Sequence, residues 1–424
     1  MTRQITRTVA AAAILAAAAG VAAAQLYVTQ NGSFDPDGSV ASPFRTLHSS
    51  ACASLDNPGP VLFEAGGYGG LGTFIAPATL QSMGGPVVLG DQGADSTSLR
   101  VVSFNTHLFG NAVPAAAIDA LVFFGIIDPL TWQDPARAER IGQWMASHTA
   151  DVYALQEVWD SSLWTSIFNN SGLPDGSYGS TIDPDDFPCM PVPGPPWCVD
   201  FPVLNMGVGT ITRPDIVEAR QAVYAAETGD DDFFEPFSSK GFVFTEIIKG
   251  GFRVAVYNTH LQAGPASNAA VFAARESQLL QLRGDVIAYR AANPGVPVIL
   301  AGDFNIVGAG SPTSEYQQRL RAVFESFDFT DAAREIYCFR ANNGNSTDND
   351  VGLGLYFNPD DSGGVRLDYI LYADSLDGSV ELVLRTMGTY PLLGPGVLTE
   401  NGFTSAFLSD HFVVDASFDV IRRD

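Results

Sequence analysis

Five short apolar runs in this chain are each bordered by polar side chains of the kinds that catalytic sites use. Between them lie segments patterned as amphipathic helices or as glycine-containing turns, so the runs are expected to be strands of an α/β domain. In such domains, functional sites are assembled where strands meet loops. The polar groups at these positions are Asn105 in VVSFNTHLFG, Glu157 in DVYALQEVWD, His260 in VAVYNTHLQAG, Asp303 and Asn305 in VILAGDFNIVG, and Asp410 and His411 in LSDHFVVDASF.

The order of these patterns predicts a layered α/β domain within residues 96–424, built from two packed mixed sheets flanked by helices. Helices are expected at residues 135–148 and 272–292, and the first has apolar side chains near helical spacing. Lys249, Gly250 and Gly251 are expected to connect two strands as a hairpin. The predicted strands are residues 101–104, 151–158, 205–214, 241–248, 252–261, 296–303, 365–374 and 411–420.

Residues 1–24 have the layout of a secretory signal peptide. They open with Arg3 and Arg7, continue through an apolar stretch and close with small residues before Gln25. A membrane anchor is the alternative, but the apolar stretch is shorter than the ~20 residues that a spanning helix needs. The mature chain is therefore expected to begin near Gln25 and to be secreted.

Residues 25–95 differ from the rest of the chain in being rich in Gly, Pro and Ser, with short β-type runs. Two of their segments resemble the opening coil of right-handed parallel β-helix proteins. About 70 residues are too few for the three stacked repeats that a solenoid needs. We therefore expect a small β-rich module whose role the sequence leaves open.

Export places the four cysteines in an oxidising compartment, where disulfides form. Cys189 and Cys198 flank the proline-rich loop MPVPGPPW and are expected to pair with each other. Cys52 and Cys338 remain open between a second disulfide and two buried thiols.

The net charge of −25 argues against a nucleic acid as partner. Proteins that grip nucleic acid neutralise several phosphates with Lys and Arg. This chain has 22 such residues against 47 Asp and Glu. Strong acidity is otherwise typical of a soluble protein with some affinity for metal ions.

The oxygen donors among the candidate residues suit a hard cation such as Mg²⁺ or another divalent ion. Glu157 and Asp303 offer carboxylates, while Asn105 and Asn305 offer amide oxygens. Each has an ordinary alternative, because Glu157 alone is more often part of an ion pair and each asparagine alone is more often a turn former.

Two histidines border strand-like runs beside these donors. An imidazole of ordinary pKa exchanges protons near neutral pH, so His260 and His411 are candidates for acid–base chemistry. Either one alone is more often a hydrogen-bonded core histidine, and it is the joint pattern that favours catalysis. His107, two residues after Asn105, is left open between a structural role and a place near the site.

This joint pattern resembles the endonuclease/exonuclease/phosphatase superfamily, whose fold is that of deoxyribonuclease I. Within it, residues 238–264 (SSKGFVFTEIIKGGFRVAVYNTHLQAG) resemble secreted bacterial neutral sphingomyelinases. So do WQDPARAERIG with DVYALQEVWD, and the short motifs LDYI, GDFN and SDH. The resemblance covers roughly residues 99–420 and implies a four-layer α/β sandwich.

The resemblance also implies roles for the candidates. Glu157 matches the principal Mg²⁺ ligand, with Asn105 beside it. His260 matches the histidine that contacts the scissile phosphoryl group. Asp303 and Asn305 match the pair that orients phosphate, metal or water.

The remaining candidates concern the attacking water. His411 matches the general base, with Asp410 next to it and Asp368 in the position that orients the base. The alternative for Asp368 is a surface salt bridge to Arg366. Lys240 is expected either near the phosphate or as a solvated lysine at a strand start.

The implied activity is the hydrolysis of sphingomyelin to ceramide and phosphocholine by a monomer in peripheral contact with a membrane. A phospholipase C acting on glycerophospholipids, a secreted nuclease of the same fold, and an extracellular binding or adhesion protein are the alternatives. Residues 390–408 are left open between an interfacial loop and a packed hairpin, and their apolar side chains are Leu392, Leu393, Val397, Leu398, Phe403 and Phe407. Residues 121–130 are a second candidate for an interfacial loop, and a buried loop is the favoured alternative for them.

Overall fold

The computed structural model describes residues 25–28, 60–68, 79–89, 95–110, 129–180, 189–191, 198–200, 205–228, 238–265, 267–308, 313–336, 355–356, 365–400 and 403–423. The expected signal peptide (residues 1–24), residues 121–128 of the expected buried loop, Cys52 and Cys338 lie outside these ranges. Within them, no helix has both the length and the apolar character needed to cross a membrane.

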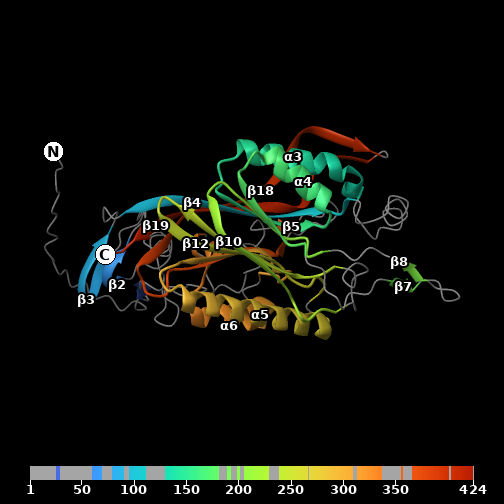
Figure 1. Ribbon diagram of the computed structural model, residues 1–424. Helices are drawn as coiled ribbons and strands as arrows, with labels where there is room; N and C mark the ends of the chain where they lie inside the picture. The colour runs from blue at the N-terminus through green and yellow to red at the C-terminus, as the bar shows by residue number, and fades with distance from the viewer. Residues whose placement is uncertain are drawn as a thin grey trace, which may run out of the picture.

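Two mixed sheets form the centre of the fold (Figure 1). The six-stranded sheet has the order β10 (Asp215–Val223), β11 (Gly241–Lys249), β12 (Phe252–His260), β13 (Val298–Asp303), β17 (Asp368–Ala373) and β14 (Thr330–Asp331). The eight-stranded sheet has the order β16 (Val365–Arg366), β15 (Leu355–Tyr356), β19 (Phe403–Arg422), β4 (Ser96–Leu108), β5 (Val152–Val158), β9 (Gly209–Thr212) and β6 (Asp175–Tyr178), with β18 (Val380–Glu400) also paired to β19.

The sheets pack face to face because successive side chains of a strand point to opposite faces. On β4, Val101 points toward the other sheet and joins Ile299 of β13 in one apolar cluster. Its neighbours Val102 and Phe104 belong to a second cluster on the outer face. Both faces of the central strands are therefore buried.

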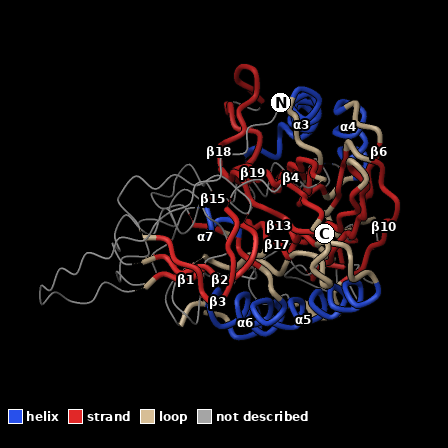
Figure 2. Tube along the Cα trace, turned by 90° about the vertical axis from the view of Figure 1, so that its left-hand side faces the viewer, coloured by secondary structure: helices blue, strands red, loops and turns tan. Residues whose placement is uncertain are grey.

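Helices cover the two outer faces (Figures 1 and 2). Helices α3 (Asp134–Ser147) and α4 (Ser161–Ser171) pack on the eight-stranded sheet, while α5 (Ala269–Ala292) and α6 (Ala322–Phe324) pack on the six-stranded sheet. The result is a four-layer α/β sandwich of the deoxyribonuclease I type, as the sequence predicts. Shorter helical segments are η2 (Pro129–Gln133), η4 (Tyr316–Arg321), η5 (Glu325–Phe327) and α7 (Ala332–Ile336).

The hairpin expected at residues 249–251 is present between β11 and β12. Lys249 pairs with Phe252, and the two residues between them, Gly250 and Gly251, have φ angles of +58° and +84°. Positive φ at both central residues is the requirement of a type I′ turn, which glycine meets without steric cost. This turn sets the register that carries β12 to its end at His260.

A separate three-stranded sheet lies at one end of the sandwich, built from β1 (Leu26–Val28), β2 (Val61–Tyr68) and β3 (Leu80–Leu89) (Figure 1). Both of its strand pairs are parallel, as in the coil that this region resembles. Its apolar face buries Leu26, Val28, Val61 and Phe63.

A two-stranded ribbon contains the predicted disulfide partners. Strand β7 (Cys189–Pro191) pairs antiparallel with β8 (Cys198–Asp200), and Cys198 lies opposite Pro191. The side chains of both cysteines fall outside the described ones, so the Cys189–Cys198 bond stays a prediction.

Strand register brings the candidate residues to one edge of the sandwich. His260 on β12 is the partner of Asp303 on β13, and Asp303 is in turn the partner of Asp368 on β17. In the other sheet, Asn105 on β4 pairs with Gln156 on β5, directly before Glu157.

Candidate active site

His411 and Asp368 form a buried hydrogen-bonded pair between the two sheets. The Nδ1 atom of His411 donates to Asp368 Oδ2 at 2.8 Å. Burial opposes a charged imidazole, but the Asp368 carboxylate outweighs it, with smaller contributions from Asp303 and Asp410, so the pKa of His411 is raised well above its ordinary value. Asp368 does not pair with Arg366, whose guanidinium lies 2.9 Å from Asp331 in the interior. The alternative of a surface salt bridge is therefore wrong.

A second cluster joins three polar side chains from three strands. The Nδ2 atom of Asn105 donates to Glu157 Oε1 at 2.8 Å and to Asp303 Oδ2 at 3.0 Å. Its Oδ1 atom accepts from the backbone N–H of His107 at 3.1 Å. Asn105 thus holds the two carboxylates together through its amide nitrogen.

The pKa values of the two carboxyl groups in this cluster are shifted in opposite directions. Burial, followed by the nearby Asp368 charge, raises the pKa of Asp303 to about 7. Burial also disfavours the Glu157 carboxylate, but a hydrogen bond from His107 and the charges of nearby histidines hold its pKa well below the ordinary value. Glu157 therefore stays ionised at neutral pH.

A divalent cation fits this donor set. Glu157, His260 and Asp303 each offer one ligand atom, and these atoms all lie within 4.8 Å of one another. Both ring nitrogens of His260 are buried without a hydrogen-bond partner among the described residues. The buried Asp303 carboxylate and the partly buried Glu157 carboxylate, beside an unsatisfied imidazole, are stabilised by a hard cation, for which carboxylate oxygens are suitable ligands.

His260 lies against Trp159 and Lys240. The His260 and Trp159 ring centroids are 5.7 Å apart, and Lys240 Nζ lies 5.1 Å from the centroid of the Trp159 ring. Burial and the Lys240 charge hold the pKa of His260 well below its ordinary value, so this imidazole is neutral at neutral pH. Lys240 itself is 1% exposed, so the expectation of a solvated lysine is wrong.

Asn305 is held at the end of β13 by two hydrogen bonds. Its backbone N–H donates to Asp303 Oδ1 at 2.8 Å, and its Nδ2 atom donates to the Leu261 carbonyl at 3.0 Å. The second bond ties the loop after β13 to the loop after β12. Asn305 therefore lies beside the Asp303 carboxylate and the chain that follows His260.

Three of the site residues adopt a backbone conformation that L-residues rarely use. Among the described non-glycine residues, only His107, Glu157, Asn305 and Asp328 have positive φ, at +50°, +54°, +51° and +60°. Such conformations are unfavourable unless the surroundings impose them, and they cluster at functional sites. Here the first three lie where β4, β5 and β13 turn toward the same edge.

His107 is the site residue that sequence reasoning left open. Its Nδ1 atom lies 3.4 Å from Glu157 Oε2 and 3.4 Å from Asp410 Oδ2. Burial opposes protonation, but the Asp410 and Glu157 carboxylates outweigh it and raise the pKa of His107 to about 9. His107 follows Asn105 by two residues at the end of the same apolar run, and this proximity was the available signal.

The three residues of the SDH motif do different things. Ser409 Oγ donates to the Asn105 carbonyl at 2.7 Å and accepts from the His411 backbone N–H at 3.0 Å. The Asp410 carboxylate faces His107, while the imidazole of His411 is oriented by Asp368. Sequence reasoning named Asp410 and His411 but gave Ser409 no role.

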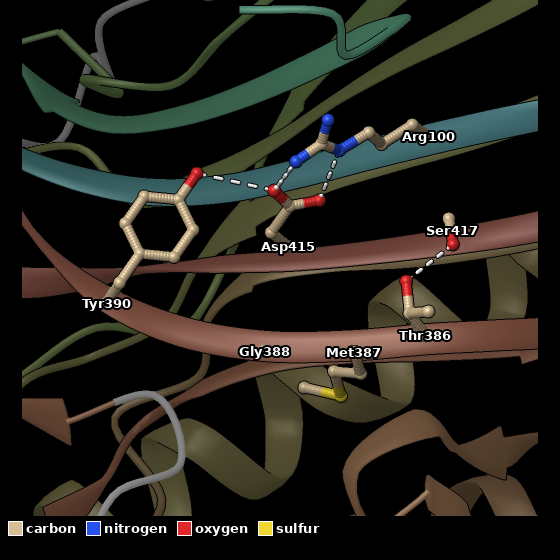
Figure 3. A pocket seen from close by; sticks show the side chains of 7 residues that line it. All are labelled: Arg100, Thr386, Met387, Gly388, Tyr390, Asp415 and Ser417. Carbon is tan, nitrogen blue, oxygen red and sulfur yellow. Dashed lines mark hydrogen bonds and ion pairs between the residues drawn. The ribbon is translucent and has the colours of Figure 1, made fainter.

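A cavity of about 390 Å³ lies elsewhere, on the outer face of the eight-stranded sheet (Figure 3). Asp415 accepts from Arg100 Nε and Nη2 at 2.9 and 2.6 Å, and Thr386 and Ser417 share a hydrogen bond of 2.6 Å. Its polar side chains satisfy one another, and none of the candidate site residues lines it. This cavity is separate from the cluster at the strand ends.

Comparisons with known proteins agree with this geometry. A sequence profile of the Endonuclease/Exonuclease/phosphatase family matches residues 102–411. Sphingomyelinase C of Bacillus cereus is 26% identical over 272 residues, which are 57% of this chain and 68% of that protein. Phospholipase C of Staphylococcus aureus is 25% identical over 247 residues, which are 54% of this chain and 62% of that protein.

A solved structure shows the same fold. The crystal structure of a beta toxin from Staphylococcus aureus superposes with a TM-score of 0.50 at 19% identity, covering 75% of this chain and 99% of that one. The family profile spans most of the chain and includes the strand ends that carry Asn105, Glu157, His260, Asp303 and His411. The protein therefore belongs to the Endonuclease/Exonuclease/phosphatase family.

Proposed function

We propose that this protein is a secreted, Mg²⁺-dependent phosphodiesterase that hydrolyses sphingomyelin to ceramide and phosphocholine. The observation that carries the proposal is the placement of the His411–Asp368 pair beside the acidic cluster, with His411 Nε2 3.8 Å from Asp303 Oδ2. Phosphodiester hydrolysis needs a base for water next to a centre that neutralises phosphoryl charge. The likeness to Sphingomyelinase C supports the choice of lipid, and the signal-like residues 1–24 support secretion.

In the proposed mechanism, His411 takes the proton from the attacking water, whose oxygen bonds to phosphorus as the bond from phosphorus to the ceramide oxygen breaks. The departing ceramide oxygen takes up a proton from the solvent. The base is the neutral form of His411, in which Nδ1–H is engaged by Asp368 at 2.8 Å and Nε2 is the atom that accepts a proton. The raised pKa of His411 belongs to the metal-free site, and a bound divalent charge beside Asp303 would lower it. The Asp368 carboxylate then stabilises the imidazolium that forms. Asp303, 3.8 Å from Nε2, would border the position of the attacking water.

Glu157 and Asp303, with Asn105 between them, would hold the cation. Bound Mg²⁺ supplies charge neutralisation and polarisation of a phosphoryl oxygen. Asn105 orients both carboxylates through its amide nitrogen, and His107 fixes the second oxygen of Glu157 from the opposite side. Asn105 and His107 thereby hold the carboxylate oxygens of the proposed cation site in fixed positions.

His260, Asn305 and Lys240 would contact the non-bridging phosphoryl oxygens. Neither ring nitrogen of His260 has a hydrogen-bond partner among the described residues, and its neutral ring offers one N–H donor. Lys240 supplies a buried positive charge beside it. Donors aimed at the position where charge develops stabilise the transition state.

The hairpin of β18 and β19 is the proposed contact with the membrane. Its distal part runs past α3 at the surface (Figure 1). Leu393 on this arm is 54% exposed, while Leu392 beside it is 6% exposed and packs in the core. An exposed apolar side chain on a projecting arm suits shallow insertion into a lipid surface.

The test uses purified mature protein that begins at Gln25. Three substrates are compared: vesicles of sphingomyelin, vesicles of phosphatidylcholine, and plasmid DNA. Each substrate is tested with Mg²⁺ and with a chelator. We expect phosphocholine release from sphingomyelin with Mg²⁺ and none with the chelator. Cleavage of DNA and of neither lipid would refute the assignment of a lipid substrate.

A second candidate is a phospholipase C that acts on glycerophospholipids. The likeness to a protein named Phospholipase C favours it, and the same catalytic residues would serve both substrates. Release of phosphocholine from phosphatidylcholine but not from sphingomyelin would select this candidate. An adhesion protein with an inactive domain would cleave no substrate in the panel.

A further inference from the structure

The first turn of α3 carries two charged side chains buried against the end of β4. Asp134 Oδ2 accepts from the backbone N–H groups of Phe109 and Gly110 at 2.7 and 2.8 Å. Asp134 Oδ1 accepts from Arg137 Nη1 at 2.6 Å. Both side chains are fully buried, so this ion pair is part of the interior and not a solvated contact.

Arg137 uses its other donors on backbone carbonyls from two strands. Its Nη2 and Nη1 atoms donate to the carbonyls of Thr106 and His107 on β4, at 2.6 and 2.9 Å. Its Nε and Nη2 atoms donate to the carbonyl of Leu408 on β19, at 3.1 and 2.8 Å. One guanidinium therefore bridges two strands of the eight-stranded sheet.

The bridge lies where the strands have stopped pairing. The ladder between β4 and β19 runs from the pair Ser96 and Ile421 to the pair Ser103 and Val414. Beyond Ser103, side chains take over the connection, through Arg137 and through Ser409 Oγ on the Asn105 carbonyl. Asn105 and His411 both lie beyond the end of this ladder, where β4 and β19 no longer pair with each other.

We propose that Arg137 is a positioning residue, which sets the distance between the metal-binding side of the site and the base. Thr106 and His107 directly follow Asn105, and Leu408 directly precedes the SDH motif that ends in His411. A planar guanidinium holds several carbonyls in one fixed geometry, which a lysine ammonium cannot reproduce. The role in turnover rests on the proposed phosphodiesterase function, whereas the role in metal binding does not.

The experiment compares Arg137→Lys with a matched variant elsewhere. Arg290 on α5 is also buried and donates to two carbonyls, those of Phe327 and Asp374, at 2.6 and 3.0 Å. Arg290→Lys removes a similar guanidinium that bridges two carbonyls, and it leaves the ends of β4 and β19 at the site unchanged. For both variants, kcat and KM on sphingomyelin, Mn²⁺ affinity by calorimetry without substrate, and thermal unfolding are measured.

For Arg137→Lys we expect kcat to fall about 100-fold with KM nearly unchanged, because misplacement by about 1 Å costs this much. The Mn²⁺ dissociation constant should rise about 10-fold or more, as when support of a metal ligand is lost. Arg290→Lys should lower the melting temperature while keeping kcat and Mn²⁺ affinity near those of the wild type. Equal losses in both variants, or an unchanged Mn²⁺ affinity in Arg137→Lys, would overturn the proposal.

Asp134→Asn is the second variant, for the case that Arg137→Lys does not fold. It keeps an oxygen for the Phe109 and Gly110 N–H groups but removes the charge that pairs with Arg137. It should weaken Mn²⁺ binding in the same direction, and wild-type affinity would count against the proposal. Wild-type protein that binds Mn²⁺ but spares sphingomyelin would refute the proposed function, while the affinity comparison would still decide the role of Arg137.

Discussion

Asp303 and Asp368 occupy directly opposite positions on the antiparallel strands β13 and β17, so two buried carboxylates face each other at one edge of the sheet. Like charges in such positions destabilise a strand pair. His411 compensates them, because its Nδ1 atom lies 2.8 Å from Asp368 and its Nε2 atom lies 3.8 Å from Asp303. The imidazolium form of His411 is therefore favoured by both acids.

Asp368→Asn should lower kcat about 1,000-fold while leaving KM within about threefold, because the amide keeps the shape of the side chain but no longer stabilises the imidazolium. Steady-state hydrolysis of sphingomyelin measures both constants. Asp377→Asn is the control, since Asp377 is exposed and accepts from the Ser379 N–H far from the site. Wild-type kcat in Asp368→Asn would refute the assigned pairing.

Glu157→Gln should abolish stabilisation of the protein by Mg²⁺. A cation at 100 times its dissociation constant raises the free energy of unfolding by about 2.7 kcal/mol when it binds only the folded state. Thermal unfolding with Mg²⁺ and with chelator measures the difference. The wild type should show it, and Glu157→Gln should unfold at the same temperature in both conditions.

His411→Ala separates turnover from metal binding. It should lose phosphocholine release, because no group remains to accept the proton from water, yet keep the stabilisation by Mg²⁺. Hydrolysis and thermal unfolding are measured on the same preparation. Near-wild-type turnover would show that His411 is not the base.

His107→Gln should change how stability depends on pH in metal-free protein. The folded-state pKa of His107 is about 9 against an ordinary 6.5, so its contribution is fully present below pH 6.5 and is lost as pH rises through 9. The contribution is on the order of 3 kcal/mol. Unfolding by urea in chelator, at pH 6 and pH 9.5, measures the free energies.

The wild type should therefore exceed His107→Gln in stability at pH 6, and the difference should shrink by pH 9.5. The difference in unfolding free energy between the two proteins cancels the contributions of the other titrating groups, as long as the substitution leaves the surroundings of those groups unchanged. A difference that stays constant across this range would mean that His107 is not charged between Glu157 and Asp410.

Leu393→Glu should reduce hydrolysis of sphingomyelin vesicles about tenfold without changing hydrolysis of a soluble phosphodiester, because a charge on the arm opposes insertion. Leu376→Glu is the matched control, since both leucines are 54% exposed and Leu376 lies in the turn between β17 and β18. Vesicle sedimentation measures binding directly. Equal loss of binding in the two variants would exclude the hairpin as the specific contact.

The fold was predictable from the sequence because its central strands are short apolar runs with clear ends. The turn at Gly250 and Gly251 and the runs ending at His260 and Asp303 are local signals, and local signals fix a strand without knowledge of its partner. The pairing of His411 with Asp368 is not local. It followed only from the resemblance to a known family, since sequence proximity favoured Asp410.

The residues that sequence reasoning left open or gave no role are those whose role depends on contacts between distant segments. His107 reaches Glu157 and Asp410 only through the packing of three strands. The sequence left Lys240 open between a place near the phosphate and a solvated lysine, because neither its burial nor its position over the Trp159 ring has a local signal. In the sequence, Arg137 has the pattern of a residue on the polar face of a helix. Its partners on β4 and β19 are backbone carbonyls, which every residue type carries, so no side chain in the sequence indicates the contact.

The pairing of β4 with β19 also determines when the site can exist during folding. The two strands are far apart in the sequence, since the hydrogen-bonded side chains of Arg100 on β4 and Asp415 on β19 are 315 residues apart. Such contacts make folding slow, because the entropy of closing a long loop is lost before the strand pairing contributes favourable free energy. A nascent chain that still lacks β19 has neither His411 nor the strand beside Asn105, so hydrolytic capacity appears only after nearly the whole domain has been synthesised.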